Sequence, residues 1–404
     1  MWKRVIAFLA ILFFVLLSDA VLSDWVPGYL QGVLGSPLMM GLMMALMMAL
    51  SSVVGFVMDL IFPQLLRNSG VRKLGGGALL GALAFMLSML SSTLWSYILL
   101  LAVGMAAWGI YYELDSFMTQ QFVAGVAPSH ERSSVWGIVR VVRHAAYFFG
   151  PIVGGYVAFY GDRAVVLGSM GVLFFAYLLF MLLNLPKDHE IDYHESSINI
   201  KEEIAHWYTL GLRVWPILIT SFMVGLIDAT FWTSGTVLTD RLAEQNPLGG
   251  WFLSAYMFPF LFAGIIVARW GVDVGKKKWA ERFLFIGSLF LILVGYIRST
   301  PLLLIVVSFA GLFVAFAFPL IDSVYTDLVA RARKGRKHIM GMSSATFSLA
   351  YVVGPIMTGY LSGLMGEKMT FTAIGIIVCI VSIILLAKTP KKLKLPQDEI
   401  QSWE

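Results

Sequence analysis

Apolar segments long enough to cross a bilayer recur along the whole chain, and they constrain its fold more than any other feature. A run of about 20 apolar residues spans the hydrocarbon core as a helix. Charged residues make up only 13% of the 404 residues, and the mean hydropathy is +0.82. Because soluble domains carry about 25% charged residues, the sequence predicts an all-α integral membrane protein.

Twelve such segments can be counted, and a polar stretch divides them into two groups of six. Their approximate bounds are 5–33, 37–62, 75–95, 98–125, 134–160, 164–185, 214–239, 250–269, 282–298, 301–328, 339–364 and 369–388. We expect an N-terminal six-helix half over 1–185, a cytoplasmic linker over 186–213, and a C-terminal half with a short cytoplasmic tail over 214–404. Within the linker, an amphipathic piece around 198–207 is expected to lie on the membrane surface.

The distribution of lysine and arginine predicts the orientation of these spans. Both residues favour cytoplasmic loops. With the N-terminus inside, all 29 of them fall on the cytoplasmic side except Arg163, Arg241, Arg298 and Lys368. We therefore expect a multi-pass protein of the plasma or inner membrane with both termini cytoplasmic. We expect its first apolar run to be an uncleaved helix rather than a signal peptide. This orientation explains the net charge of +5 without a nucleic-acid partner.

Short matches between the two groups of spans indicate an internal repeat. Gly150-Pro151-Ile152-Val153-Gly154-Gly155 matches Gly354-Pro355-Ile356-Met357-Thr358-Gly359 at an offset of 204. Asp115-Ser116 matches Asp322-Ser323, and Asp19-Ala20 matches Asp228-Ala229. Because the three matches occur in the same order, the sequence predicts two pseudo-symmetric halves, an arrangement that places substrate near the midplane between them.

With these motifs the chain resembles the major facilitator superfamily over essentially its full length. Gly150-Pro151-x-x-Gly154-Gly155 is similar to the GxxxGPxxGG motif of that family's proton-coupled antiporters, although Ala146 replaces the first glycine. Gly55 and Asp59 fit the GxxxD pattern that follows the second span, a region that helps to hold one conformational state in the family. Plain close packing of helices is an alternative role for the glycines. The resemblance implies secondary transport of a small molecule by alternating access in a monomer, and it favours proton-coupled export.

Acidic residues deep in the predicted spans are the first candidates for function, because each costs about 2.5–3.5 kcal/mol to insert. The candidates for handling protons or substrate are Asp19, Asp24, Asp228 and Asp322. Of these, Asp19, Asp228 and Asp322 have no obvious fixed partner. Burial favours the neutral form of a carboxyl group, so such a group can accept a proton on one side of the membrane and release it on the other. Binding of a cationic substrate, or a hydrogen bond to a neighbouring helix, is the alternative.

A second candidate is a charge cluster or gate between the fourth and fifth spans. Asp115 and Arg143 each lie about ten residues from the inner end of their span, at matching depth. The predicted cluster consists of Glu113, Asp115, Arg140, Arg143 and His144. It is interpreted as a structural ion-pair network, a gate, or a site for an anionic group of the substrate.

No motif for a cofactor, a metal or an enzymatic reaction is visible. The single cysteine, Cys379, excludes an intrachain disulfide. His189, His194 and His206 show no metal-ligand spacing, and we expect them in a solvated loop. Gly271–Lys276 has the wrong spacing for a P-loop, so transport must draw on a gradient. Two alternatives stay open: a uniporter or symporter of an organic anion or sugar-like solute, and a membrane scaffold or sensor that transports nothing.

Overall fold

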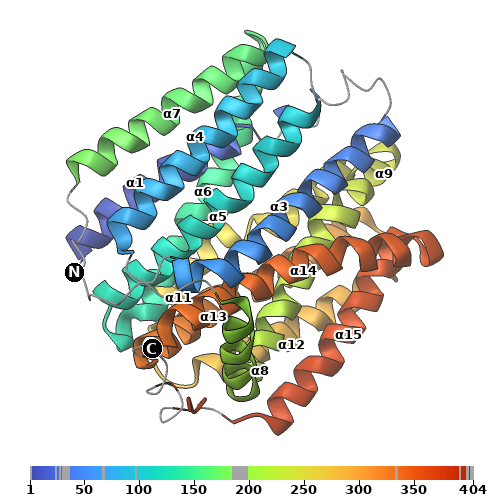
Figure 1. Cartoon of the computed structure of the whole chain (residues 1–404). Helices are drawn as coiled ribbons and strands as arrows, with labels where there is room; N and C mark the ends of the chain where they lie inside the picture. The colour runs from blue at the N-terminus through green and yellow to red at the C-terminus, as the bar shows by residue number, and fades with distance from the viewer. Residues whose placement is uncertain are drawn as a thin grey trace. The chain divides into compact units, whose positions relative to one another are not determined.

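A computed structural model of the chain describes residues 2–22, 25–26, 29, 37–65, 69–95, 98–183, 199–332, 335–390, 393–396 and 400. Within these ranges all regular secondary structure is helical, and it contains no strand. Figure 1 shows long helices throughout the chain. The prediction of an all-α fold is confirmed.

The first six predicted spans each contain one long helix. These helices are α1 (Trp2–Ala20), α3 (Pro37–Leu65), α4 (Val71–Trp95), α5 (Ile98–Val126), α6 (Arg132–Ala158) and α7 (Asp162–Leu182), with a short 3-10 turn, η1 (Ser129–Glu131), before α6. The helix α1 is shorter than the predicted span 5–33. Directly after Ala20, the N–H of Leu22 donates to the carbonyl of Asp19, at 3.0 Å, in a tighter turn.

The next two spans are interrupted helices. The seventh consists of α8 (Ile200–Thr230), a π-helical turn η2 (Phe231–Gly235) and α9 (Thr236–Gln245). The eighth consists of η3 (Pro247–Trp251), α10 (Phe252–Met257) and α11 (Phe260–Trp270). The break between α10 and α11 falls at Pro259, which has no N–H for the helical ladder.

Four continuous helices complete the chain and bring the described spans to the predicted twelve. They are α12 (Lys276–Val294), α13 (Thr300–Arg331), α14 (Arg336–Met365) and α15 (Glu367–Lys388). Seven stretches among the described residues are long and apolar enough to cross a membrane by themselves. Many of their large apolar side chains point outward, as Leu80, Leu182 and Ile356 do. Such apolar outer faces suit contact with lipid rather than water.

The predicted linker is partly helical. Residues 200–213 form the first turns of α8, which continues without interruption into the seventh span. The amphipathic piece around 198–207 is therefore the start of a long helix rather than a separate surface helix. Glu202 and Glu203 lie in its first turn, where acidic side chains stabilise the positive end of the helix dipole.

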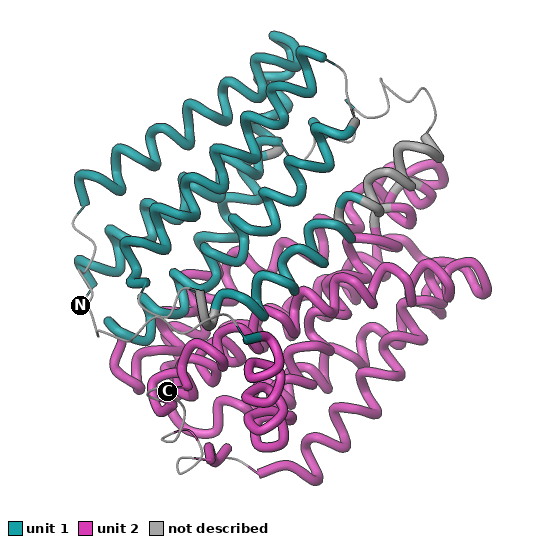
Figure 2. Tube along the Cα trace, in the orientation of Figure 1, with its two compact units in different colours: residues 1–126, 142–199 teal, residues 127–141, 200–404 magenta. Residues whose placement is uncertain are grey.

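The backbone divides into two compact units, coloured separately in Figure 2. Unit 1 comprises residues 1–126 and 142–199, and unit 2 comprises residues 127–141 and 200–404. The division cuts through α6, so that the beginning of this helix belongs to unit 2 and the remainder belongs to unit 1.

Candidate functional site

In unit 1, Asp19 lies in the last turn of α1 and is held by two side chains from other helices. The indole Nε1 of Trp108, on α5, donates to Asp19 Oδ2 at 2.9 Å. The hydroxyl of Tyr147, on α6, donates to the same oxygen at 3.2 Å. Asp19 is buried, and among the described residues no lysine or arginine is within ion-pair distance of it. Its immediate partners are thus neutral donors.

In unit 2, Asp228 has the same kind of surroundings. The hydroxyl of Tyr256, on α10, donates to Asp228 Oδ1 at 2.8 Å. The hydroxyl of Tyr351, on α14, donates to Asp228 Oδ2. Arg140 influences Asp228 electrostatically but forms its ion pair with Asp322 instead. Asp228 is therefore also hydrogen-bonded by neutral groups only, within the part of the chain that is described.

The glycines of the repeated motif bring these tyrosines to the aspartates. A side-chain carbon at Gly150 would lie 2.3 Å from the Cβ of Ala20, and one at Gly354 would lie 2.7 Å from the Cβ of Ala229. Only glycine permits this close approach without a shift of one helix. Because Ala20 and Ala229 directly follow the two aspartates, each glycine fixes a motif helix beside an acidic residue.

The remaining motif positions differ in their surroundings. Gly154 packs against the backbone of Val21, whose carbonyl oxygen would be 2.3 Å from an added Cβ. Gly155 has nothing within 4 Å of an added Cβ. Pro151 and Pro355 both lie inside their helices, which continue past them. The close packing thus comes from the first two glycines of the motif.

Sequence reasoning missed the hydrogen-bond donors. Tyr147 and Tyr351 stand at the same place before the Gly-Pro pair of their own half, and they are separated by the repeat offset of 204. That shared offset was the signal that could have found them. Trp108 and Tyr256 come from helices that do not correspond in the two halves, so the repeat gives no indication of their role.

The predicted charge cluster is only partly assembled. In unit 1, Arg143 Nη2 lies 2.5 Å from Asp115 Oδ2 and also donates to Thr119 Oγ1 at 3.2 Å. Asp115 is completely buried. Glu113 is buried on the same helix, and His144 is half-buried beside Arg143.

Arg140 has a different partner from the one expected. In unit 2 its Nε and Nη2 donate to the two carboxylate oxygens of Asp322, at 2.6 and 2.9 Å. Its guanidinium also lies 4.5 Å from the ring centroid of Phe318. The expectation that Asp322 has no fixed partner is therefore wrong. In the second half, Phe347 stands where the repeat would place a counterpart of Arg143. Asp322 therefore has no arginine at the matching position of its own half, and Arg140 of α6 is its partner instead.

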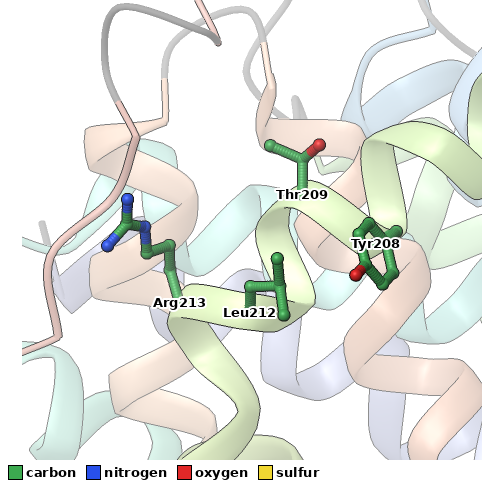
Figure 3. Close-up of a pocket in the computed structure, with 4 residues that line it drawn as sticks. All are labelled: Tyr208, Thr209, Leu212 and Arg213. Atoms are coloured by element: carbon green, nitrogen blue, oxygen red, sulfur yellow. The ribbon is translucent and has the colours of Figure 1, made fainter.

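Two other predicted residues and one pocket lie apart from these contacts or outside the described residues. Asp59 is completely buried in α3. Asp24 lies outside the described residues. A shallow pocket of about 340 Å³ is lined by Tyr208, Thr209, Leu212 and Arg213, which Figure 3 shows on one stretch of α8. None of the candidate acidic residues lines it.

Comparison with known proteins agrees with the fold. A family profile described as "Major Facilitator Superfamily" matches residues 217–403. The quinolone resistance protein NorA of Staphylococcus aureus (strain MRSA252) is 22% identical over 292 residues, which cover 69% of this chain and 70% of that protein.

Two solved structures share the architecture over nearly the whole chain. The human organic anion transporter MFSD10 (TETRAN) matches with a TM-score of 0.75 at 16% identity, covering 95% of this chain and 99% of that one. A variant of the E. coli fucose:proton symporter FucP matches with a TM-score of 0.65 at 13% identity, covering 96% and 100%. The helical fold, the family profile and the NorA relative together define a multi-pass membrane transporter rather than an enzyme.

These comparisons make the chain a secondary transporter of the plasma membrane, and its residues 217–403 are similar to the major facilitator superfamily.

Proposed function

We propose that this transporter exports a small solute in exchange for protons, and that Asp19 and Asp228 carry the protons. The observation behind the proposal is that these two acids occupy matching places in the repeat and are hydrogen-bonded by neutral side chains. An acid that is ion-paired with arginine is held in its charged form, whereas an acid with neutral partners can exchange protons. Asp115 and Asp322 belong to the first kind.

A planar, partly apolar cation or zwitterion is the solute class that we propose. The acids supply negative charge, and aromatic side chains donate hydrogen bonds to them. Near Asp228, the rings of Phe231 and Tyr256 are stacked with their centroids 3.6 Å apart. Near Asp19, Trp108 stacks on Tyr112 at 5.2 Å. A relative named for quinolone resistance supports an aromatic solute and export, since removal of a drug from the cell is one route to resistance. We further propose that both termini lie in the cytoplasm, on the basis of the lysine and arginine bias. A monomer is proposed only because the resemblance to the major facilitator superfamily implies one.

Proton flux in vesicles tests the function directly. The purified chain is reconstituted with a pH-sensitive dye inside, and cationic, neutral and anionic solutes are applied in turn. We expect solute-dependent proton movement in the wild type and its loss in Asp228→Asn and in Asp19→Asn. Asp273→Asn is the matched control, because Asp273 is an exposed carboxylate outside the helices. Coupled transport that persists in both membrane variants would exclude these acids as proton carriers.

The alternative of anion or sugar-like transport makes the opposite prediction in the same experiment. Arg140 and Arg143 would bind the substrate, and Arg140 retains 21% exposure of its side chain. However, both guanidinium groups are already engaged by carboxylates. Uptake of an anionic or neutral solute without proton movement, unaffected by Asp228→Asn, would favour this alternative.

A further inference from the structure

A group of three potential metal ligands lies where α8 and α14 begin, several helical turns before Asp228. Glu203 and His206 are three residues apart on α8 and so share one face of that helix. His338 is the third residue of α14, and the two helices pack against each other within unit 2. The expectation that His206 lies in a solvated loop is wrong, because residue 206 belongs to the second turn of α8.

The ligand atoms of the three residues are close together. One ligand atom from each lies within 4.8 Å of the others. His338 Nδ1 is 2.7 Å from Glu203 Oε1 and 2.8 Å from Oε2, and the two imidazole centroids are 4.7 Å apart. Donor atoms of a tetrahedral zinc site are separated by roughly 3.3 Å, given Zn–N bonds of about 2.0–2.1 Å. Small side-chain rotations are enough to reach that spacing.

Burial and charge at this point also favour a cation. Glu203 is completely buried, and Trp207 Nε1 donates to its Oε1 at 2.6 Å. Such a hydrogen bond to a ligating carboxylate is typical of the outer shell of a metal site. Two protonated imidazoles at this distance would repel each other, whereas one divalent ion can bind both rings in their neutral form together with the carboxylate.

We propose that Glu203, His206 and His338 form a site for a divalent transition-metal ion of the zinc class, independent of the transported solute. Two imidazoles and one carboxylate are ligands suited to Zn²⁺ or Co²⁺, while Ca²⁺ and Mg²⁺ prefer oxygen alone. Three protein ligands leave a coordination position for water. A bound ion would join the beginning of α8 to the beginning of α14 and hold these two helix ends together.

Metal binding to the full-length protein tests the proposal. The chain, with any histidine tag removed, is purified in detergent, stripped with a chelator and titrated with Co²⁺. We expect one Co²⁺ per chain, with the visible absorption of a low-coordinate nitrogen–oxygen site that disappears when Zn²⁺ is added. His206→Ala and His338→Gln should each weaken binding by at least about tenfold. In His338→Gln the amide can still donate to Glu203, which protects the fold.

His130→Ala is the matched control, because His130 is exposed at 63% of its side chain and lies outside the cluster. Its Co²⁺ affinity should equal that of the wild type. A wild type that fails to bind Co²⁺ would overturn the proposal and leave a simple ion pair between His338 and Glu203. Equal binding by the wild type, His206→Ala and His338→Gln would overturn it as well, since the metal would then bind elsewhere.

Discussion

The two halves of the chain agree at one pair of aspartates and differ at the other. Asp19 and Asp228 each accept a hydrogen bond from a tyrosine at the same place in the repeat. Asp115 and Asp322 also correspond, but the first binds Arg143 in unit 1 and the second binds Arg140 in unit 2. Asp19 and Asp228 thus have neutral hydrogen-bond partners in both halves. For Asp115 and Asp322, in contrast, both arginine partners come from the same helix, α6.

This comparison separates acids that can change their charge from acids that must keep it. A buried ion pair loses most of its stabilisation when one partner is removed, because the other charge is left uncompensated. A buried acid with neutral partners can be neutral itself. Mutations at the two kinds of site should therefore differ in whether they mainly change stability or mainly change transport.

The largest effect on stability is expected from Arg143→Ala. The change leaves Asp115, which is 0% exposed, without its cation, at a cost of about 3–5 kcal/mol. Arg140→Ala should cost less, about 1.5–3 kcal/mol, because the side chains of Arg140 and Asp322 are both partly exposed. Thermal unfolding of the detergent-solubilised protein measures both variants.

The control for this prediction is neutralisation of the partner acid. Adding Asp115→Asn to Arg143→Ala should recover much of the lost stability, and Asp322→Asn should do the same for Arg140→Ala. If the double variants are as unstable as the single ones, the ion pairs are not the source of the effect.

An intermediate effect is expected from filling the helix contact at the motif glycines. In Gly150→Ala the new methyl group would meet Ala20 at 2.3 Å, and the resulting overpacking should cost about 1–3 kcal/mol. Gly354→Ala should cost less, since its nearest contact is 2.7 Å. Gly155→Ala is the internal control because nothing lies within 4 Å of the added carbon. Equal melting temperatures for Gly150→Ala and Gly155→Ala would contradict the assigned packing.

The smallest effect is expected from removing a single tyrosine hydroxyl. Tyr147→Phe and Tyr351→Phe each delete one hydrogen bond to an aspartate, worth about 0.5–1.5 kcal/mol. Coupled transport in vesicles should fall by no more than about tenfold in either variant. Tyr177→Phe, at an exposed position on α7, serves as the reference. A strong loss in only one of the two variants would show that the two halves do not share this contact equally.

Much of the fold could be predicted because hydrophobic length is a local property. Each span must satisfy its own backbone hydrogen bonds in lipid, so its extent is encoded in the segment itself. The interruptions were harder to foresee. The break at Pro259 has a sequence signal, but the π-helical turn after Thr230 contains no proline and only the terminal Gly235.

The candidate site could be predicted only where depth and repeat position were enough. Depth arguments correctly indicated that Asp115 and Arg143 could meet. They could not choose between Asp115 and Asp322 as the partner of Arg140, because that choice depends on which way a side chain points from α6. The contact of Glu203 with His338 joins residues that are 135 positions apart, and no periodicity in the sequence relates them.

The π-helical turn η2 places one additional residue within the seventh span. A π turn is equivalent to one extra residue accommodated in an α-helix. If that residue were taken back into regular helix, everything beyond it would turn by about 100° and advance by about 1.5 Å. Because η2 begins three residues after Asp228, this spare residue lies between the aspartate and the whole of α9. Such a change would reset α9 against the acid in a single discrete step, without unfolding the helix.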